Sequence, residues 1–262
     1  MNTLYLMPYA GLCNRIRAIS SCVKFASDND LRLKIFWAND IDLSADFLHL
    51  FAPFELANVE LVKLRWFHII YFRARRSNCY LPRLIRKIFS MSQFEDCSLK
   101  NPPPKGIYGG GYLSTCRPIV SGGNVEDVFV LNEGINSQLE SILLKFSDST
   151  VGVHIRRGDH KRAIDASPIE FFIESMDAKV RKEEAVKFFL ATDDLDVKDL
   201  LKSRYGDKII VNESPLTRTS VNGMSGAVID LWALANCTSI IGSQYSMFSL
   251  VASEIKNIPL EI

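Results

Sequence analysis

The sequence predicts an α/β protein with two Rossmann-like domains, each built on a parallel sheet. The chain has 262 residues and is 47% hydrophobic, which is enough apolar material for two modest cores. The second half alternates short apolar runs with longer amphipathic ones, and this alternation is typical of βα units that form a parallel sheet. The first forty residues open with the same pattern.

The individual elements follow from these runs and from the residues between them. At the start we expect a strand at 3–7, a turn at 8–14, a helix at 15–26 and a strand at 33–37. A helix is expected at 132–145, and we place the domain boundary after it, which gives domains 1–146 and 147–262. The second domain is expected to hold strands at 151–155, 186–191, 208–211 and 239–242 and helices at 168–180, 195–205, 226–235 and 247–255.

Local signals mark two of these helix ends. Residues 167–170, Ser-Pro-Ile-Glu, have the pattern of a capping box with Pro168 at the first helical position. Gly206 follows the 195–205 helix, where a C-cap glycine is expected.

Composition excludes several classes of protein. The formal net charge of +1 provides no general field for nucleic acid, so no nucleic-acid partner is expected. The six cysteines show no C-x-x-C pair and no zinc-finger spacing, and we expect them to be reduced and no metal to be bound. The apolar start breaks at Pro8, too early for a signal peptide or a membrane span, so a cytoplasmic protein is expected.

One stretch, from Val62 to Ser92, is strongly basic. It contains eight Lys or Arg residues, no Asp or Glu, and several interleaved aromatic residues. Such a mixture suits contact with anionic lipid headgroups, which would place the protein peripherally on the inner face of the cytoplasmic membrane, or contact with a negatively charged acceptor. The alternative is a solvated helix face.

Ligands of open parallel sheets bind beyond the carboxyl ends of the strands, so the residues at each strand exit matter most. The 151–155 strand is followed by two arginines, and strand alternation places His154 and Arg156 on one face and Arg157 on the other. Arg156 can bind a diphosphate through two N–H groups and stabilise the charge that grows on a leaving group. Alternatively, the arginines form structural ion pairs with Asp159 and Asp193, and His154 is a core histidine.

Two further strand exits carry acidic residues. Thr192 and Asp193 lie between a strand and a helix, where they contact the donor or simply cap the helix. Asp230 is expected at a helix start, where its carboxylate can accept the paired N–H donors of a guanine edge. The alternative for Asp230 is a first-turn acid that favours the helix dipole.

The last exit is a serine-rich turn with Ser243, Ser246 and Met247 at the start of a helix. Backbone N–H groups and hydroxyls at such a turn suit a phosphate, although the serines can instead cap the helix.

The N-terminal turn is a comparable anion cradle, formed by Gly11, Cys13, Asn14 and Arg15. Neither G-x-G-x-x-G nor the Walker pattern is present there, which argues against NAD-dependent redox chemistry and ATP hydrolysis.

Four segments together resemble the fucosyltransferase group that includes the α1,6-, nodulation-factor and α1,2-fucosyltransferases. Residues 154–159 are similar to the group's H-x-R-R-x-D signature, and residues 189–194 to its second motif. Residues 230–254 resemble the third motif and residues 11–15 the opening glycine turn, all in the expected order. Residues 40–148 match nothing in the group.

The resemblance implies a GT-B fold, with two Rossmann-like domains facing each other across a donor and acceptor cleft. It also implies metal-independent transfer of fucose from GDP-fucose with inversion, without a cofactor. By resemblance Arg156 contacts the β-phosphate, and His154 and Asp230 lie near the guanosine. Ser246 and the Gly11 turn then lie near the diphosphate.

The general base and the acceptor lie outside these four motifs or at their edges. Relatives place an acidic residue soon after H-x-R-R-x-D, and the altered spacing here leaves Asp165 as the candidate, with Asp159 as the other possibility. The expected acceptor is a surface polysaccharide or a lipid-linked oligosaccharide. Two other hypotheses are a transferase for another GDP-sugar and a non-catalytic GDP-sugar-binding module.

Overall fold

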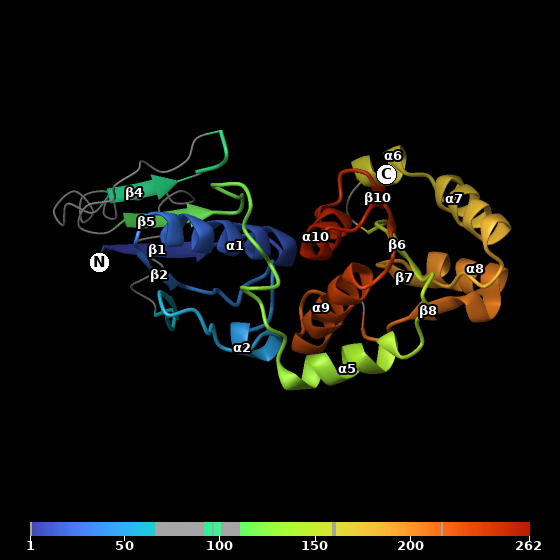
Figure 1. Cartoon of the computed structure of the whole chain (residues 1–262), viewed down its shortest axis with the longest axis horizontal. Coiled ribbons are helices and arrows are strands. Elements are labelled where there is room, and N and C mark those ends of the chain that lie inside the picture. Colours follow the sequence, from blue (N-terminus) through green and yellow to red (C-terminus); the bar gives the residue numbers. More distant parts are fainter. Residues whose placement is uncertain (1, 66–91, 96, 101–110, 159–160, 216) are drawn as a thin grey trace. The chain divides into compact units, whose positions relative to one another are not determined.

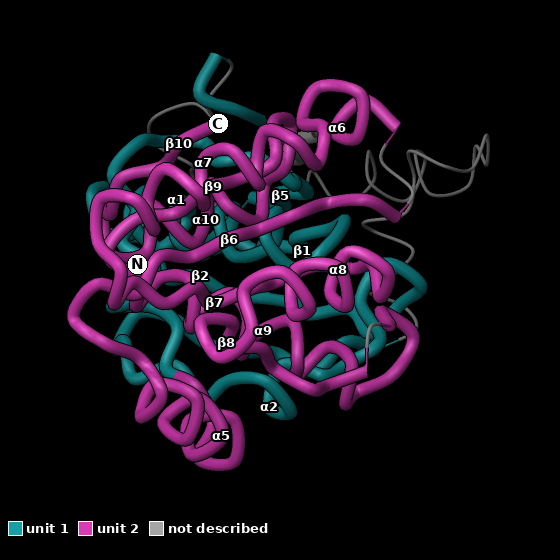
Figure 2. The backbone as a smooth tube through the Cα atoms, turned by 90° about the vertical axis from the view of Figure 1, so that its right-hand side faces the viewer, with its two compact units in different colours: residues 1–130 teal, residues 131–262 magenta. Residues whose placement is uncertain are grey.

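The computed structural model describes residues 2–65, 92–95, 97–100, 111–158, 161–215 and 217–262 (Figure 1). The chain divides into two compact units, residues 1–130 and 131–262, which Figure 2 shows in different colours. Each unit contains a five-stranded sheet in which every neighbouring pair of strands is parallel. The α/β class and the two Rossmann-like sheets predicted from sequence are therefore confirmed.

The first unit is organised around a buried central strand, β1. Its strands are β1 (Thr3–Pro8), β2 (Arg32–Ile35), β3 (Val59–Leu61), β4 (Ser92–Glu95) and β5 (Gly111–Thr115), in the sheet order β3-β2-β1-β5-β4. Leu4 and Leu6 of β1 are fully buried. Helix α1 (Leu12–Asp28) packs on β1 and β2 and begins three residues before the expected start because Gly11, in an extended conformation, is its N-cap.

The segment after β2 is held by aromatic packing. The short helix α2 (Phe47–Leu50) places Phe47 edge-on to Trp37, with ring centroids 5.4 Å apart. Phe129, which comes from the end of the unit, packs on Phe51 at 4.9 Å. The Trp37 indole N–H donates to the carbonyl oxygen of Ala45 at 2.9 Å, which satisfies the buried donor.

The second unit has the regular βα rhythm predicted from sequence. The sheet order is β10-β9-β6-β7-β8, with β6 at the centre. Its strands are β6 (Val151–Ile155), β7 (Phe188–Thr192), β8 (Ile209–Val211), β9 (Ile240–Gly242) and β10 (Leu260–Glu261). Its helices are α5 (Glu133–Leu143), α6 (Lys161–Ala166), α7 (Ile169–Lys182), α8 (Leu195–Tyr205), α9 (Val221–Ala235) and α10 (Met247–Lys256).

Both faces of this sheet are covered, as expected of a parallel sheet. On one face Val153 and Leu190 pack with Phe172 of α7 and Leu201 of α8. Helices α9 and α10 contact β6 and β9 on the other face. There Gly152 allows close packing, because a Cβ atom at this position would lie 2.8 Å from the side chain of Leu234 of α9, which would have to shift.

In the second unit, the starts of α7 and α9 also differ from the sequence prediction. The 167–170 capping box is wrong: Pro168 is the N-cap of α7, and the Ser167 hydroxyl instead accepts the backbone N–H of Gln244 at 2.8 Å. Helix α9 begins at Val221 rather than at Gly226, because Ser220 caps it by accepting the Gly223 N–H at 3.1 Å. The expected C-cap at Gly206 is confirmed, with φ at 55°.

The division between the units falls before α5, between residues 130 and 131. The sequence predicts a domain boundary after this helix, at 146/147. Ile135, Leu139 and Ile142 form the buried stripe of α5, and the helix packs on α9. Because this stripe is buried by the second unit, α5 belongs to that unit.

Most of the basic stretch from Val62 to Ser92 lies outside the described residues, so its expected membrane or acceptor contact stays a prediction. Asp159 lies outside them as well. Within the described ranges, no helix is both long and apolar enough to cross a membrane.

The close approach at Gly223 leads to a stability prediction. A Cβ atom there would lie 2.0 Å from the carbonyl oxygen of Thr217, a backbone atom that cannot move cheaply. Gly223→Ala should therefore lower the free energy of unfolding by about 1–3 kcal/mol. In the matched variant Gly134→Ala of α5, the new methyl group has ordinary contacts, and we expect a gain of about 0.4–1 kcal/mol. Urea denaturation of both variants checks this, and equal midpoints would contradict it.

Candidate functional site

The carboxyl ends of four neighbouring strands in the second unit bring polar residues together along one edge of the sheet. In the spatial order β8-β7-β6-β9, the residues that follow these strands are Asn212, Asp193, Arg156 and Ser243. Adjacent strands lie about 4.8 Å apart, so this row spans roughly 14 Å. Its place beyond the carboxyl ends is where open α/β sheets bind ligands.

Asp193 holds the exit of β6 in place. One of its carboxylate oxygens accepts the backbone N–H of Arg157 at 2.7 Å and that of Gly158 at 3.3 Å, and the other accepts from the Arg156 guanidinium. A Cβ atom on Gly158 would lie 2.6 Å from the same carboxylate, so a larger residue there would displace Asp193. The ion pair that is the alternative role for Arg156 is therefore present, with Asp193 as its partner.

Neither Asp193 nor Thr192 is the N-cap of α8, which corrects the capping alternative. Asp194 has that role, because its side chain accepts the Val197 N–H at 3.1 Å. The Thr192 hydroxyl accepts the backbone N–H of Asp194 at 3.3 Å and so supports the turn.

The two arginines lie on opposite faces of β6, as strand alternation predicted. Arg157 donates to the carbonyl oxygen of Ser167 at 2.9 Å and lies over the Phe172 ring on the α7 side, 5.9 Å from its centroid. Arg156 stays at the sheet edge, where 19% of its side chain is exposed beside Asp193. Arg157 thus supports the loop, and Arg156 is the arginine that can meet a ligand.

His154 lies on the α10 side of β6. Its ring stacks on Phe248 with centroids 5.0 Å apart, and its Nδ1 atom is buried with no hydrogen-bond partner in the described part of the chain. Burial lowers the pKa of His154 to about 4; Asp193 opposes this shift and Arg156 adds to it. The imidazole is therefore neutral at physiological pH and can form one further hydrogen bond.

Asp230 lies in the middle of α9, not at a helix start, so the expected first-turn position is wrong. The helix starts five residues before the expected position 226, and its residues Gly223 and Gly226 allow close approach to Thr217 and Ser214. Although the residue as a whole is half-buried, its Oδ1 atom is enclosed and has no partner among the described residues.

Burial raises the pKa of Asp230 to about 7, against the lowering effects of a hydrogen bond from Asn212 and of the Lys198 charge. Lys198 is itself buried and donates to Glu213 at 2.7 Å, and this bond is the largest cause that lowers the pKa of Glu213 to about 2. Sequence reasoning missed Asn212 and Lys198. Asn212 follows a strand directly, so the strand-exit argument could have found it, whereas Lys198 gives no local signal.

The serines of the β9–α10 turn are structural. The fully buried Ser243 accepts the Arg156 N–H at 2.9 Å and donates to the carbonyl oxygen of His154 at 3.3 Å, which ties β9 to β6. Ser246 is the N-cap of α10, where it accepts the Phe248 N–H at 3.3 Å, and Met247 is the first residue of that helix. The capping alternative is therefore observed for Ser246.

In the first unit, the glycine turn leads into α1 as expected. Gly11 is the N-cap without a side-chain cap, and a Cβ atom placed on it would meet nothing within 4 Å. Cys13 is buried in the first turn, Asn14 is half-buried, and the first turn has no acidic residue. This helix start can therefore accept an anion from the open side of Gly11.

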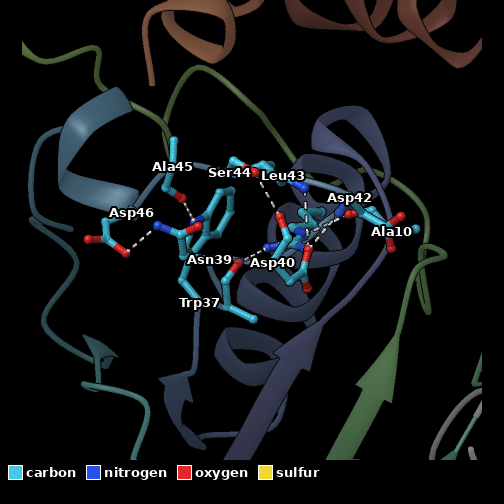
Figure 3. A network of polar contacts seen from close by, with 11 residues as sticks. Ala10, Trp37, Asn39, Asp40, Asp42, Leu43, Ser44, Ala45 and Asp46 are labelled. Atoms are coloured by element: carbon cyan, nitrogen blue, oxygen red, sulfur yellow. Dashed lines mark hydrogen bonds and ion pairs between the residues drawn. The ribbon is translucent and has the colours of Figure 1, made fainter. Parts of the chain in front are cut away.

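Arg15 has a structural role rather than the expected role at the donor. Its side chain is fully buried and donates to the carbonyl oxygen of Ala10 at 2.7 Å, to that of Ala38, and to Asp40 at 2.8 Å. Asp40 also accepts the backbone N–H of Asp42 at 3.0 Å (Figure 3). Arg15 therefore braces the turn at Ala10, which has a left-handed φ of 66°, against the loop after β2.

The candidate base Asp165 lies exposed on α6, and its side chain has no hydrogen bond or ion pair with the described residues. Nothing among these residues orients it for proton transfer. No group of acidic, His or Cys side chains that could hold a metal ion occurs in the described part of the chain.

Comparison with known proteins identifies the architecture. No protein-family model matches the sequence, and neither does any curated protein. Among solved structures, the NodZ α-1,6-fucosyltransferase with GDP has a TM-score of 0.65 and 18% identity over 96% of this chain and 92% of its own. The chain has the GT-B fold.

Two further solved structures share this fold. A variant of Arabidopsis thaliana FUT1 in complex with GDP has a TM-score of 0.67 and 13% identity, over 99% of this chain and 69% of its own. POFUT1 in complex with GDP has a TM-score of 0.61 and 12% identity, over 99% of this chain and 98% of its own. At these identities the likeness establishes the fold and not the activity.

The buried carboxyl group of Asp230 makes a pH prediction. It is protonated in the folded chain up to about pH 7 but ionises near its ordinary value when unfolded, so its contribution to stability falls as pH rises from about 4 to 7. Asp230→Asn lacks this penalty. The stability of the variant relative to the native chain should therefore increase over that interval, by at most about 4 kcal/mol.

Urea denaturation at several pH values measures this difference. His154 is common to both proteins, so its own titration cancels in the comparison. A difference that stays flat between pH 4 and 7 would show that Asp230 is not a shifted acid.

Proposed function

We propose that the protein is a fucosyltransferase that transfers fucose from GDP-fucose to a hydroxyl group of a glycan. The observation that carries this proposal is a set of three side chains at the carboxyl edge of the second sheet. Among the described residues, one carboxylate oxygen of Asp230 and one ring nitrogen of His154 have no hydrogen-bond partner, and Arg156 supplies a cation. Their chemistry matches a guanine base followed by a diphosphate. The GT-B fold, shared with fucosyltransferases that bind GDP, supports the same assignment.

Guanine recognition is assigned to Asp230. A carboxylate accepts the two adjacent N–H donors of guanine, and neither adenine nor uracil presents donors in that arrangement. Buried polar atoms without partners are uncommon, and a bound base would satisfy the Oδ1 atom of Asp230. His154 provides a second polar contact near the base through its Nδ1 atom.

The diphosphate is assigned to Arg156. Asp193 fixes its guanidinium at the strand exit while part of the side chain remains exposed, and a guanidinium has five donors in a fork. Preorganised positive charge there stabilises the GDP leaving group as the glycosidic bond breaks. Ser246 and Met247 are proposed further donor contacts, and in the first unit the helix start at Gly11, Cys13 and Asn14 is a proposed anion site through its backbone N–H groups.

The proposed reaction is metal-independent and inverts the anomeric centre. The acceptor oxygen bonds to the anomeric carbon from the face opposite GDP, the carbon–phosphate oxygen bond breaks with its electrons going to GDP, and a carboxylate takes the hydroxyl proton. Asp165 and Asp159 are the proposed bases. We propose a surface polysaccharide or lipid-linked oligosaccharide as acceptor, supported by the basic and aromatic composition between Val62 and Ser92.

Arg156→Lys tests the assignment of the diphosphate. Lysine keeps the positive charge but loses the fork, so hydrolysis and transfer rates with GDP-fucose should fall by roughly 10- to 100-fold. Arg181→Lys on the exposed surface of α7 is the matched control and should behave like the native chain. Native rates in Arg156→Lys would remove Arg156 from the mechanism.

GDP affinity should depend on pH through Asp230. Only the ionised carboxylate accepts both guanine N–H groups, so with a pKa of about 7 the dissociation constant should rise about tenfold between pH 8 and pH 6. Calorimetry at pH 6 should detect proton release on binding.

Asp230→Asn should bind GDP weakly and without this pH dependence, whereas the exposed Asp196→Asn of α8 serves as the unchanged control. If UDP or ATP stabilises the native chain against heat and GDP does not, the guanine assignment is wrong. Tight GDP binding without hydrolysis or transfer of the sugar, from GDP-fucose or GDP-mannose, would indicate a binding module instead.

A further inference from the structure

The turn between β9 and α10 presents an aromatic ring in an unusual backbone conformation. Tyr245 has φ of 60°, in the left-handed region that disfavours residues other than glycine, asparagine and aspartate. Despite this cost, the side chain is a large aromatic group, and 56% of it is exposed. Backbone strain of this kind concentrates at functional sites, where the surrounding structure enforces it.

A guanidinium lies on the Tyr245 ring. The Cζ atom of Arg162 on α6 is 4.9 Å from the ring centroid. Arg162 makes no hydrogen bond or ion pair with the described residues. Within this part of the chain, its guanidinium interacts with the Tyr245 ring. Ring and guanidinium thus form one surface, which offers an apolar face beside several N–H donors that make no hydrogen bond with the described residues.

This surface is preorganised. The backbone N–H of Gln244, next to Tyr245, donates to the Ser167 hydroxyl at 2.8 Å, and Ser167 directly follows α6. The Ser167 N–H donates back to Ala163 of α6 at 3.0 Å, and its carbonyl oxygen accepts from Arg157. The turn and the helix are therefore tied together at a buried point beneath the exposed pair.

The position of the pair along the sheet edge indicates its ligand. Asp230 and Asn212 lie toward β8, Arg156 follows β6, and Tyr245 follows β9, on the other side of β6. A nucleoside diphosphate with its base at Asp230 and its phosphates at Arg156 therefore directs its far end toward Tyr245. In a sugar nucleotide the group attached to the diphosphate is a sugar. The acceptor that approaches this end of the donor is a sugar as well.

We propose that Tyr245 and Arg162 form a pyranose-binding platform, in which the C–H face of a sugar ring stacks on the Tyr245 ring and its hydroxyl groups accept from Arg162. This inference rests on the proposed function for the direction of the donor. The ring is either the transferred sugar or a sugar of the acceptor. Asp165 is three residues after Arg162 on α6, which places the proposed base beside the platform.

The test separates the ring from the backbone. Tyr245→Asn keeps a residue that tolerates the left-handed conformation and removes the ring, and Tyr245→Phe keeps the ring. Arg162→Gln removes the donor fork, with Arg181→Gln of α7 as the matched control. The probes are methyl α-fucopyranoside and methyl β-N-acetylglucosaminide, observed by saturation-transfer NMR, which requires neither GDP binding nor turnover.

The expected result is saturation transfer to at least one glycoside in the native chain and in Tyr245→Phe. Tyr245→Asn and Arg162→Gln should each weaken binding by roughly 3- to 10-fold, while Arg181→Gln leaves it unchanged. The affinity for GDP should be the same in all five proteins. Absence of glycoside binding in the native chain, or native binding in Tyr245→Asn, would overturn the platform.

Addition of saturating GDP-fucose identifies the source of the sugar. Displacement of the glycoside assigns the platform to the transferred sugar, and retention assigns it to the acceptor. If the native chain does not bind GDP, the proposed function fails, but the glycoside measurement still decides the platform. If GDP binds and hydrolysis of GDP-fucose proceeds while glycoside binding is insensitive to Tyr245, the function stands and the platform fails.

Discussion

The arrangement of the second sheet's edge depends on one carboxylate, that of Asp193. It accepts two consecutive backbone N–H groups from the loop after β6 and at the same time pairs with the guanidinium of Arg156. Because it comes from the end of β7, it joins two neighbouring strand exits at the point where the chain would otherwise leave polar groups unsatisfied. The position of Arg156, and with it the candidate diphosphate site, follows from this contact.

Hydrogen-bond partners and exposure distinguish three arginines, Arg15 of the first unit and Arg156 and Arg157 of the second. Arg15 is enclosed by carbonyl oxygens and Asp40, and Arg157 donates to the Ser167 carbonyl, so both are parts of the framework. Arg156 shares its charge with Asp193 but remains partly exposed at the edge. Of these three arginines, Arg156 is therefore the candidate for a ligand contact.

Two buried groups with opposite pKa shifts give the site its chemical character. Burial lowers the pKa of His154 and raises that of Asp230, so both favour the neutral form when no ligand is bound. Each retains an atom without a hydrogen-bond partner in the described residues. A polar base that forms hydrogen bonds with both atoms would offset part of the free energy lost by burying them. This gain would contribute to the affinity for the base.

Much of the fold was predictable because its signals are local. The β6 and α8 boundaries agree with the expected ones, and the exit residues follow directly from where strands end. The start of α9 was not predictable from its glycines, because their role is close packing against Thr217 and Ser214 in the segment before the helix, and that contact depends on how the segment folds back. The Ser167 hydroxyl was misassigned for the same reason, since its partner Gln244 is distant in sequence.

The sequence by itself determined the α/β class, the parallel order implied by the βα rhythm, and the faces of β6 on which His154, Arg156 and Arg157 lie. These follow from hydrophobic period and strand alternation, which act between near neighbours. Only the tertiary structure decided that Asp193 pairs with Arg156, that Arg15 is a buried brace, that Asp230 is mid-helix with an enclosed carboxylate, and that Arg162 stacks on Tyr245. Each of these depends on contacts between residues far apart in the chain, and side-chain partners at such separations are chosen by packing rather than by local pattern.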